Sequence, residues 1–237
     1  MKLFRRIKIW LKSLIRKPAP TPIKPVVRDE PKEPVKAPTG REQRFPKDYV
    51  NKTVERYTQM KVGEGLIGRQ NVGHIEWYKK RLLHGKDRYE KASRLVRVAT
   101  GYDIPWQIIG VIHGMEGGFD FKKQILNGQP ITRKTTWVPK GRGPWSSWEE
   151  SCIDAFTWDD KYKIVPEVWG VAQTALFNER WNGMSYWNRG RPSPYIWGYS
   201  SIQKPGKYVS DGKYDHSAVT QQVGVLPQLE EIGFFDE

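Results

Sequence analysis

A proline-rich stretch near the start of the chain limits where a packed core can form. Seven prolines lie between residues 18 and 40 of the 237-residue chain, without a hydrophobic repeat. Proline lacks a backbone N–H and its ring breaks helices, so such a stretch stays extended. The sequence therefore predicts a Pro-rich linker over residues 18–44 and one folded domain over residues 45–237.

The segment before the linker, residues 1–17, is basic and amphipathic. Residues 1–40 hold 11 Lys/Arg against 3 Asp/Glu, a net +8 out of the total of +14. Apolar residues recur at spacings of three and four, which favours an interfacial helix on an anionic membrane; a short disordered basic arm is the alternative. Lys or Arg interrupts every apolar run, so we expect neither a spanning helix nor a cleavable signal peptide.

The remaining charge and the single cysteine narrow the function classes. Residues 41–237 carry only about +6, and their aromatic region is not especially basic, so we expect no nucleic-acid partner. Cys152 has no partner for an intramolecular disulfide, and the four histidines lack zinc-type spacing. We therefore expect no metal and no other cofactor. Separately, we expect the chain to be a monomer.

The pattern of the folded domain predicts a mainly α (α+β) fold. Helical periodicity and end signals predict helices over residues 48–60, 74–84, 87–100, 105–116, 146–158, 166–181 and 217–231. Turn residues mixed with β-branched residues predict a short β-hairpin over residues 126–144. The fold would thus be helical, with one small hairpin directly after the helix that ends at Glu116.

Glu116 is the residue with the clearest chemical signal. It ends an apolar helix, VIHGMEGG, and two glycines follow it. An apolar setting raises the pKa of a carboxyl group, because desolvation disfavours the charged form. A glutamate that is protonated near neutral pH can donate its proton to a glycosidic oxygen. A carboxylate that simply reaches solvent at a helix end is the alternative.

Three separated segments resemble one known group of proteins. The segments are VIHGMEGGFDF, LNGQPITRKTTWVPKGRGPW and ALFNERWNGMSYWNRGRPSPYIWGYSSIQKPGKYVSDG. Over about residues 88–230 they resemble phage and bacterial lysozyme-like domains, related to goose-type lysozymes and lytic transglycosylases. The resemblance implies a lysozyme-like helical fold with Glu116 as catalytic acid. Asn182 and Tyr186 match an Asn-Gly, then Tyr segment that lines the sugar site in that group.

The second catalytic group is less clear from the sequence. A hydrolase needs a group on the far side of the sugar. Asp120 is the nearest carboxylate, although a turn cap is its alternative role, and Thr136 of the predicted hairpin could position a water molecule. In one branch of lysozymes an Asp and a Thr follow the glutamate at set distances; here Ile125 stands at the expected Asp position.

Further residues are candidates for holding a sugar chain. His113 lies three residues before Glu116, roughly on the same helix face, where it could contact substrate or simply pack. Trp137 and Tyr195 offer ring faces, and Tyr195 also offers a hydroxyl. With Asn182 and Tyr186 they form the predicted substrate-binding set.

The sequence and the resemblance together favour an enzyme that cleaves the glycan strands of peptidoglycan at the cell wall or in the periplasm. A lytic transglycosylase needs no second carboxylate and is the first alternative. A binding module that has lost turnover and a nucleic-acid binder are the alternatives from other classes.

Overall fold

The computed structural model describes residues 45–66, 72–158, 165–210 and 212–236, all within the compact unit Glu33–Glu237. The predicted amphipathic segment 1–17 and the linker 18–44 lie outside these residues, so the membrane contact stays a prediction. None of the helices in the described ranges combines the length and apolarity that a membrane-spanning segment needs.

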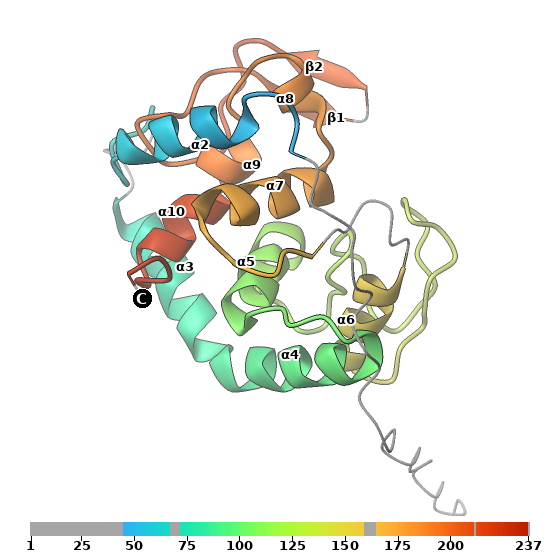
Figure 1. Ribbon diagram of the computed structural model, residues 1–237. Helices are drawn as coiled ribbons and strands as arrows, with labels where there is room; N and C mark the ends of the chain where they lie inside the picture. The colour runs from blue at the N-terminus through green and yellow to red at the C-terminus, as the bar shows by residue number, and fades with distance from the viewer. Residues whose placement is uncertain (1–44, 67–71, 159–164, 211, 237) are drawn as a thin grey trace, which may run out of the picture. The chain divides into compact units, whose positions relative to one another are not determined.

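The described chain is mostly helical, with one small antiparallel sheet (Figure 1). In chain order the helices are α2 (Tyr49–Thr58), α3 (Val72–His84), α4 (Lys86–Thr100), α5 (Trp106–Gly117), α6 (Trp148–Thr157), α7 (Val171–Asn182), α8 (Ser185–Asn188), α9 (Pro194–Trp197) and α10 (Val225–Glu230). Strands β1 (Lys207–Ser210) and β2 (Lys213–Asp215) pair with a bulge between Tyr208 and Ser210. The predicted α+β class is confirmed at this level.

Helix α5 forms the centre of the core. Nine of its 12 residues are buried, and it packs against α3, α4 and α10 (Figure 1). A Cβ on Gly110 would lie 2.3 Å from Leu82 Cδ1, so this glycine allows the close approach of α5 to α3. The helix begins after Pro105 and ends at Gly118, whose φ of 62° suits glycine. The apolar run of the sequence therefore became a central helix with Glu116 in its last turn.

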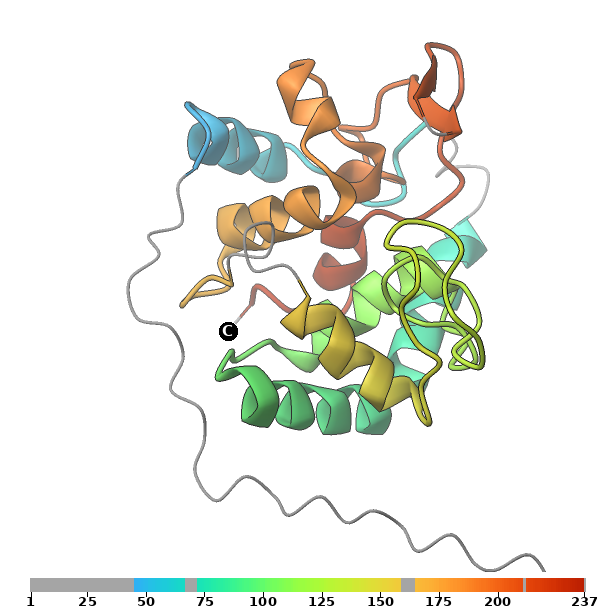
Figure 2. The same cartoon turned by 90° about the vertical axis from the view of Figure 1, so that its right-hand side faces the viewer.

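The predicted hairpin over residues 126–144 is wrong, because the sheet lies at 207–215 instead. Residues 126–144 form an irregular loop whose backbone is held mainly by side chains, and Figure 2 shows its yellow-green trace beside α6. Pro139 and Pro144 cannot donate to a β-ladder. The turn residues were interpreted correctly, because the chain does reverse direction here, but it forms no strands on either side of the turn.

Two predicted helices are shorter than expected. The helix predicted over 166–181 begins only at Val171, because the backbone is extended at Gly170, where ψ is 171°. The helix predicted over 217–231 is confined to Val225–Glu230. Before it, Asp215 Oδ1 accepts from the Ser217 N–H at 2.8 Å, which fixes a turn in place of a helix.

Candidate active site

Glu116 lies in the last turn of α5, at the edge of the core. The residues on either side of it, Met115 and Gly117, are buried, whereas Glu116 is partly exposed and Gly118 is exposed. The carboxyl group is therefore carried on a rigid apolar helix to a place that solvent can reach. This arrangement agrees with what the sequence predicts for the helix end.

Two side chains from distant parts of the chain contact the Glu116 carboxyl group. The Tyr195 hydroxyl of α9 donates to Glu116 Oε1 at 3.1 Å, and the indole of Trp181 in α7 forms a second hydrogen bond. Burial raises the pKa of Glu116 to about 7, while these two hydrogen bonds lower it in part. A substantial fraction of this carboxyl group is therefore protonated at neutral pH, as a proton donor requires.

The backbone on either side of the carboxyl is fixed by close contacts. A Cβ on Gly128 would lie 2.2 Å from the Glu116 carbonyl oxygen, so only glycine lets the loop pass here. The Gln222 side-chain amide donates to the Met115 carbonyl at 2.9 Å. The loop thus passes close to the Glu116 carbonyl, and the C-terminal segment holds the Met115 carbonyl by a hydrogen bond.

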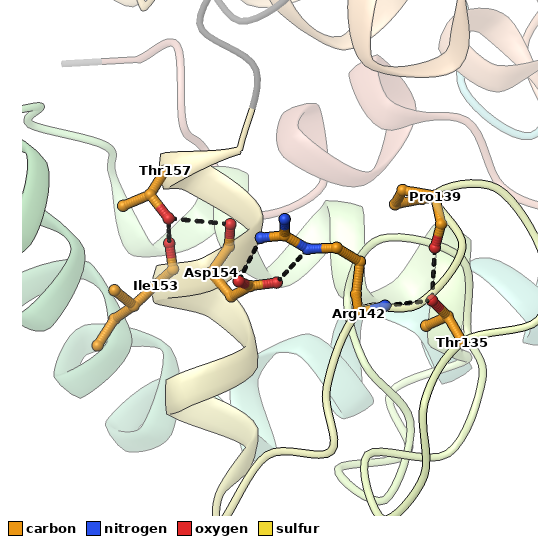
Figure 3. A network of polar contacts seen from close by, with 6 residues as sticks. All are labelled: Thr135, Pro139, Arg142, Ile153, Asp154 and Thr157. Atoms are coloured by element: carbon orange, nitrogen blue, oxygen red, sulfur yellow. Dashed lines mark hydrogen bonds and ion pairs between the residues drawn. The ribbon is translucent and has the colours of Figure 1, made fainter.

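Side-chain hydrogen bonds hold the loop next to Glu116. Gln129 Oε1 accepts from the backbone N–H groups of Thr136 and Trp137 at 2.8 and 3.0 Å. Figure 3 shows how Arg142 ties the far end of the loop to α6 through a two-pronged ion pair with Asp154. The Arg142 N–H also donates to the Thr135 hydroxyl at 3.0 Å, so the loop is restrained along much of its length (Figure 3).

A cavity of about 580 Å³ lies next to Tyr195. Its walls come from α7 to α9, from the β1–β2 hairpin and from the segment before α10, and they consist of Asn182, Ser185, Tyr186, Pro194, Tyr195, Lys207, Tyr208, Val209, Ser210, Gly212, Thr220 and Gln222. Tyr195 lines the cavity and also donates to Glu116, while Gln222 lines it and holds the Met115 carbonyl. Tyr195 therefore connects the cavity to the Glu116 carboxyl group, which is not itself part of the described cavity wall.

The structure brings three of the predicted substrate-binding residues together. Asn182, Tyr186 and Tyr195 all line the cavity. The Tyr186 hydroxyl accepts a hydrogen bond from the Tyr208 N–H at 3.0 Å, which fixes its ring against β1. These residues offer an amide, a hydroxyl and ring faces, the groups that sugars use for hydrogen bonding and stacking.

His113 lies in the core and does not face the cavity. It is 0 % exposed, and burial lowers its pKa to about 4, so it is neutral at pH 7. Its Nε2 lies 3.2 Å from the Asp120 carbonyl, and its Nδ1 lies 2.9 Å from the Tyr89 hydroxyl. A carbonyl only accepts, so Nε2 carries the proton and Tyr89 donates to Nδ1. His113 therefore holds the turn after Glu116 and cannot contact a substrate.

The other three predicted site residues lie outside the cavity wall. Asp120 is exposed and caps the turn, because its Oδ1 accepts from the Lys122 N–H at 3.0 Å. The Thr136 hydroxyl accepts from the Gln129 side-chain amide at 2.8 Å. Trp137 is 64 % exposed on the loop surface. None of the three lines the cavity.

Sequence reasoning missed Trp181, Lys207, Tyr208 and Gln222. Trp181 directly precedes Asn182, but nothing in the local pattern shows that its indole reaches a carboxyl group on another helix. Gln222 was assigned to a helix that the structure does not contain at that position. Each contact joins segments that are far apart along the chain, and only the tertiary fold creates it.

The described residues contain no group of three or more His, Cys, Asp or Glu side chains that could hold a metal ion. The functional groups that these residues bring together are a partly buried carboxyl group, a tyrosine hydroxyl and an indole, next to a polar cavity. Such an arrangement can deliver a proton to a neutral ligand next to Tyr195.

Comparisons with known proteins add no relative: no protein-family model, curated protein or solved structure matches this chain. The surroundings of Glu116 and the cavity that Tyr195 connects to it are therefore the features that indicate a function.

Proposed function

We propose that this protein is a peptidoglycan-degrading glycosidase of the lysozyme-like type, in which Glu116 is the general acid. One observation carries the proposal: a carboxyl group with its pKa raised to about 7 is hydrogen-bonded to Tyr195, which lines a cavity of about 580 Å³. The order of the three segments that resemble lysozyme-like domains agrees with this role for Glu116.

The proposed reaction begins with proton transfer. The Glu116 carboxyl donates its proton to the oxygen that bridges two sugars, and the bond between that oxygen and the anomeric carbon breaks. The electron pair goes to the oxygen, which leaves as a hydroxyl group, and positive charge develops on the other sugar. A nucleophile then attacks that sugar and gives its proton to the Glu116 carboxylate, which restores the acid.

The cavity residues would hold the glycan during this step. The Asn182 amide and the hydroxyl groups of Ser185 and Thr220 offer hydrogen bonds to sugar hydroxyls and acetamido groups. The rings of Tyr186 and Tyr195 offer faces for the C–H surface of a sugar. Trp137 of the exposed loop stays a prediction for a more distant part of the strand.

A lytic transglycosylase is the second candidate, and a specific observation favours it. The described cavity wall contains no carboxylate, and the Asp120 carboxylate caps its own turn. Hydrolysis by paired carboxylates requires a second acidic group across the sugar. A lytic transglycosylase needs only Glu116, because a hydroxyl group of the substrate itself attacks the cleaved sugar and closes a ring on it.

Mass spectrometry of digested peptidoglycan tests the proposal and separates the two candidates. Purified walls are incubated with the full chain, and the soluble fragments are analysed. Fragments with reducing ends identify a hydrolase, and fragments with anhydro ends identify a transglycosylase. Retention of the protein on walls without release of fragments would contradict the enzyme and leave a binding module.

A further inference from the structure

The cavity wall formed by β1 is positively charged. Strand β1 contributes Lys207, Tyr208, Val209 and Ser210 to the lining. Lys207 is the only charged residue among the described lining residues, and it is partly buried. A lysine that faces a polar cavity without a carboxylate on the same wall favours an anionic ligand group.

The acidic neighbour of Lys207 does not neutralise it directly. Asp215 lies opposite Lys207 in the register of the two strands. However, Asp215 Oδ1 accepts hydrogen bonds from the N–H and hydroxyl of Ser217, both at 2.8 Å, and from the Ala218 N–H at 3.2 Å. Asp215 forms no ion pair with Lys207. Its carboxylate instead fixes the turn after β2.

A second cation lies beside the same wall. Arg189 Nε donates to the Tyr208 hydroxyl at 3.1 Å. The Arg189 guanidinium also lies 5.6 Å from the Tyr208 ring centroid and 5.1 Å from the Tyr214 ring centroid. Arg189 does not itself line the described cavity wall, but it holds the hydroxyl group of Tyr208, which does.

The wall that carries Lys207 is held in place by packed rings. The Tyr186 hydroxyl accepts from the Tyr208 N–H at 3.0 Å, and the ring centroids of these two residues lie 5.6 Å apart. Tyr208 and Tyr214 meet edge to face at 5.2 Å. The backbone of Lys207 is thus fixed at the cavity, which reduces the entropy that a ligand contact must offset.

We propose that Lys207, assisted by Arg189, binds a carboxylate on a side group of the glycan. The preferred substrate is then an acid-bearing strand, not a neutral amino-sugar polymer. This inference rests on the proposed function, because it concerns the same cavity. In peptidoglycan the carboxylate comes from the peptide attached to alternate sugars or, where the peptide is absent, from the lactyl group itself.

The experiment compares four soluble strands that differ in charge. Two carry carboxylates: peptide-bearing strands, and strands from which an amidase has removed the peptide so that the lactyl carboxylate is free. The other two are the same strands after chemical amidation of their carboxylates. Binding is measured with Glu116→Gln, which keeps the strands intact, and kcat/KM is measured with the wild type. We expect tighter binding and higher kcat/KM for one or both charged strands, by about tenfold over the amidated form, a typical effect of one charge-assisted hydrogen bond. The strand that shows the preference identifies the source of the carboxylate.

Lys207→Met should abolish this preference, and Lys213→Met is the matched control. Lys213 is an exposed lysine of the same hairpin that does not line the cavity, so its loss should leave the preference unchanged. Equal binding of charged and amidated strands, or a preference that survives Lys207→Met, would overturn the inference even if the strands are cleaved. Absence of both binding and cleavage for all four strands would overturn the inference and the proposed function together.

Discussion

The last turns of α5 and α7 each carry a glutamate whose pKa is raised by desolvation, but only the glutamate of α5 is hydrogen-bonded to a residue of the cavity wall. Glu116 is partly exposed and shares Tyr195 with the cavity wall. Glu179 of α7 is 4 % exposed and does not line the cavity. Burial raises the pKa of Glu179 to about 8, while the charge of Arg56 and the Ser193 hydroxyl oppose the increase.

The two glutamates show that a raised pKa by itself does not identify an active site. Both shifts come mainly from desolvation, and the larger one belongs to Glu179, which has no hydrogen bond to the described cavity wall. The Oε1 atom of Glu179 has no hydrogen-bond partner among the residues that the structure describes. A proton on Glu179 therefore compensates for burial, whereas a proton on Glu116 lies beside Tyr195, a residue of the cavity wall.

The largest expected effect is the difference in activity between two matched variants. Glu116→Gln removes the proton donor with little change in shape, so release of fragments from peptidoglycan should fall by about 10²- to 10⁴-fold. Glu179→Gln makes the same change away from the cavity and should retain activity within a few-fold. Full activity of Glu116→Gln, or an equal loss in both variants, would break the comparison.

The next effect concerns stability, where both variants should change in the same direction. A carboxyl group whose pKa rises on folding binds more protons in the folded state, so stability falls as pH increases between the two pKa values. For Glu116 this range runs from about 4.5 to about 7. Glu116→Gln should therefore be more stable than the wild type at pH 9, by up to about 3 kcal/mol, with no gain at pH 4.

Urea unfolding at pH 4 and pH 9 measures this difference. Glu179→Gln should also be more stable than the wild type at high pH. Because the folded pKa of Glu179 is higher, this difference should keep growing up to about pH 8 and then stay constant. A Glu116→Gln variant without any gain at pH 9 would mean that the wild-type carboxyl is well solvated, and the proton donor would lose its physical basis.

The smallest expected effect is a shift in the pH dependence of the reaction. Wild-type kcat/KM should fall about tenfold per pH unit above about pH 7, as Glu116 loses its proton. The Tyr195 hydrogen bond lowers the pKa of Glu116, so Tyr195→Phe should move this decline to higher pH, by up to about one unit.

Tyr186→Phe is the control for that shift. Tyr186 lines the same cavity, but its hydroxyl accepts from the Tyr208 N–H. Its loss should change KM without moving the decline. If both variants move the decline equally, or neither does, the hydrogen bond from Tyr195 has no particular influence on Glu116.

The sequence by itself determined the central helix and the candidate acid. The apolar run from Ile108 to Met115 can only be stable when buried on all sides, and the glycines after Glu116 end the helix. The mainly helical class also follows from local periodicity, which depends on neighbours three and four residues apart.

Local patterns failed where side chains from elsewhere decide the backbone conformation. The loop over 126–144 contains turn residues and β-branched residues. However, the N–H groups of Thr136 and Trp137 donate to the side chain of Gln129 and not to a neighbouring strand. Residues 217–224 are polar and regular enough to predict a helix, but Asp215 fixes a turn there and Gly224 lies against the backbone of α9.

Only the tertiary structure decided which polar residues meet. It placed His113 in the core and Glu116 within hydrogen-bond distance of a cavity-wall residue, although the two are one helical turn apart. It also brought Trp181 and Tyr195 to the carboxyl group across long stretches of chain. The physical reason is that a pKa and a cavity depend on the atoms that surround a group in space, and a sequence pattern records only its neighbours along the chain.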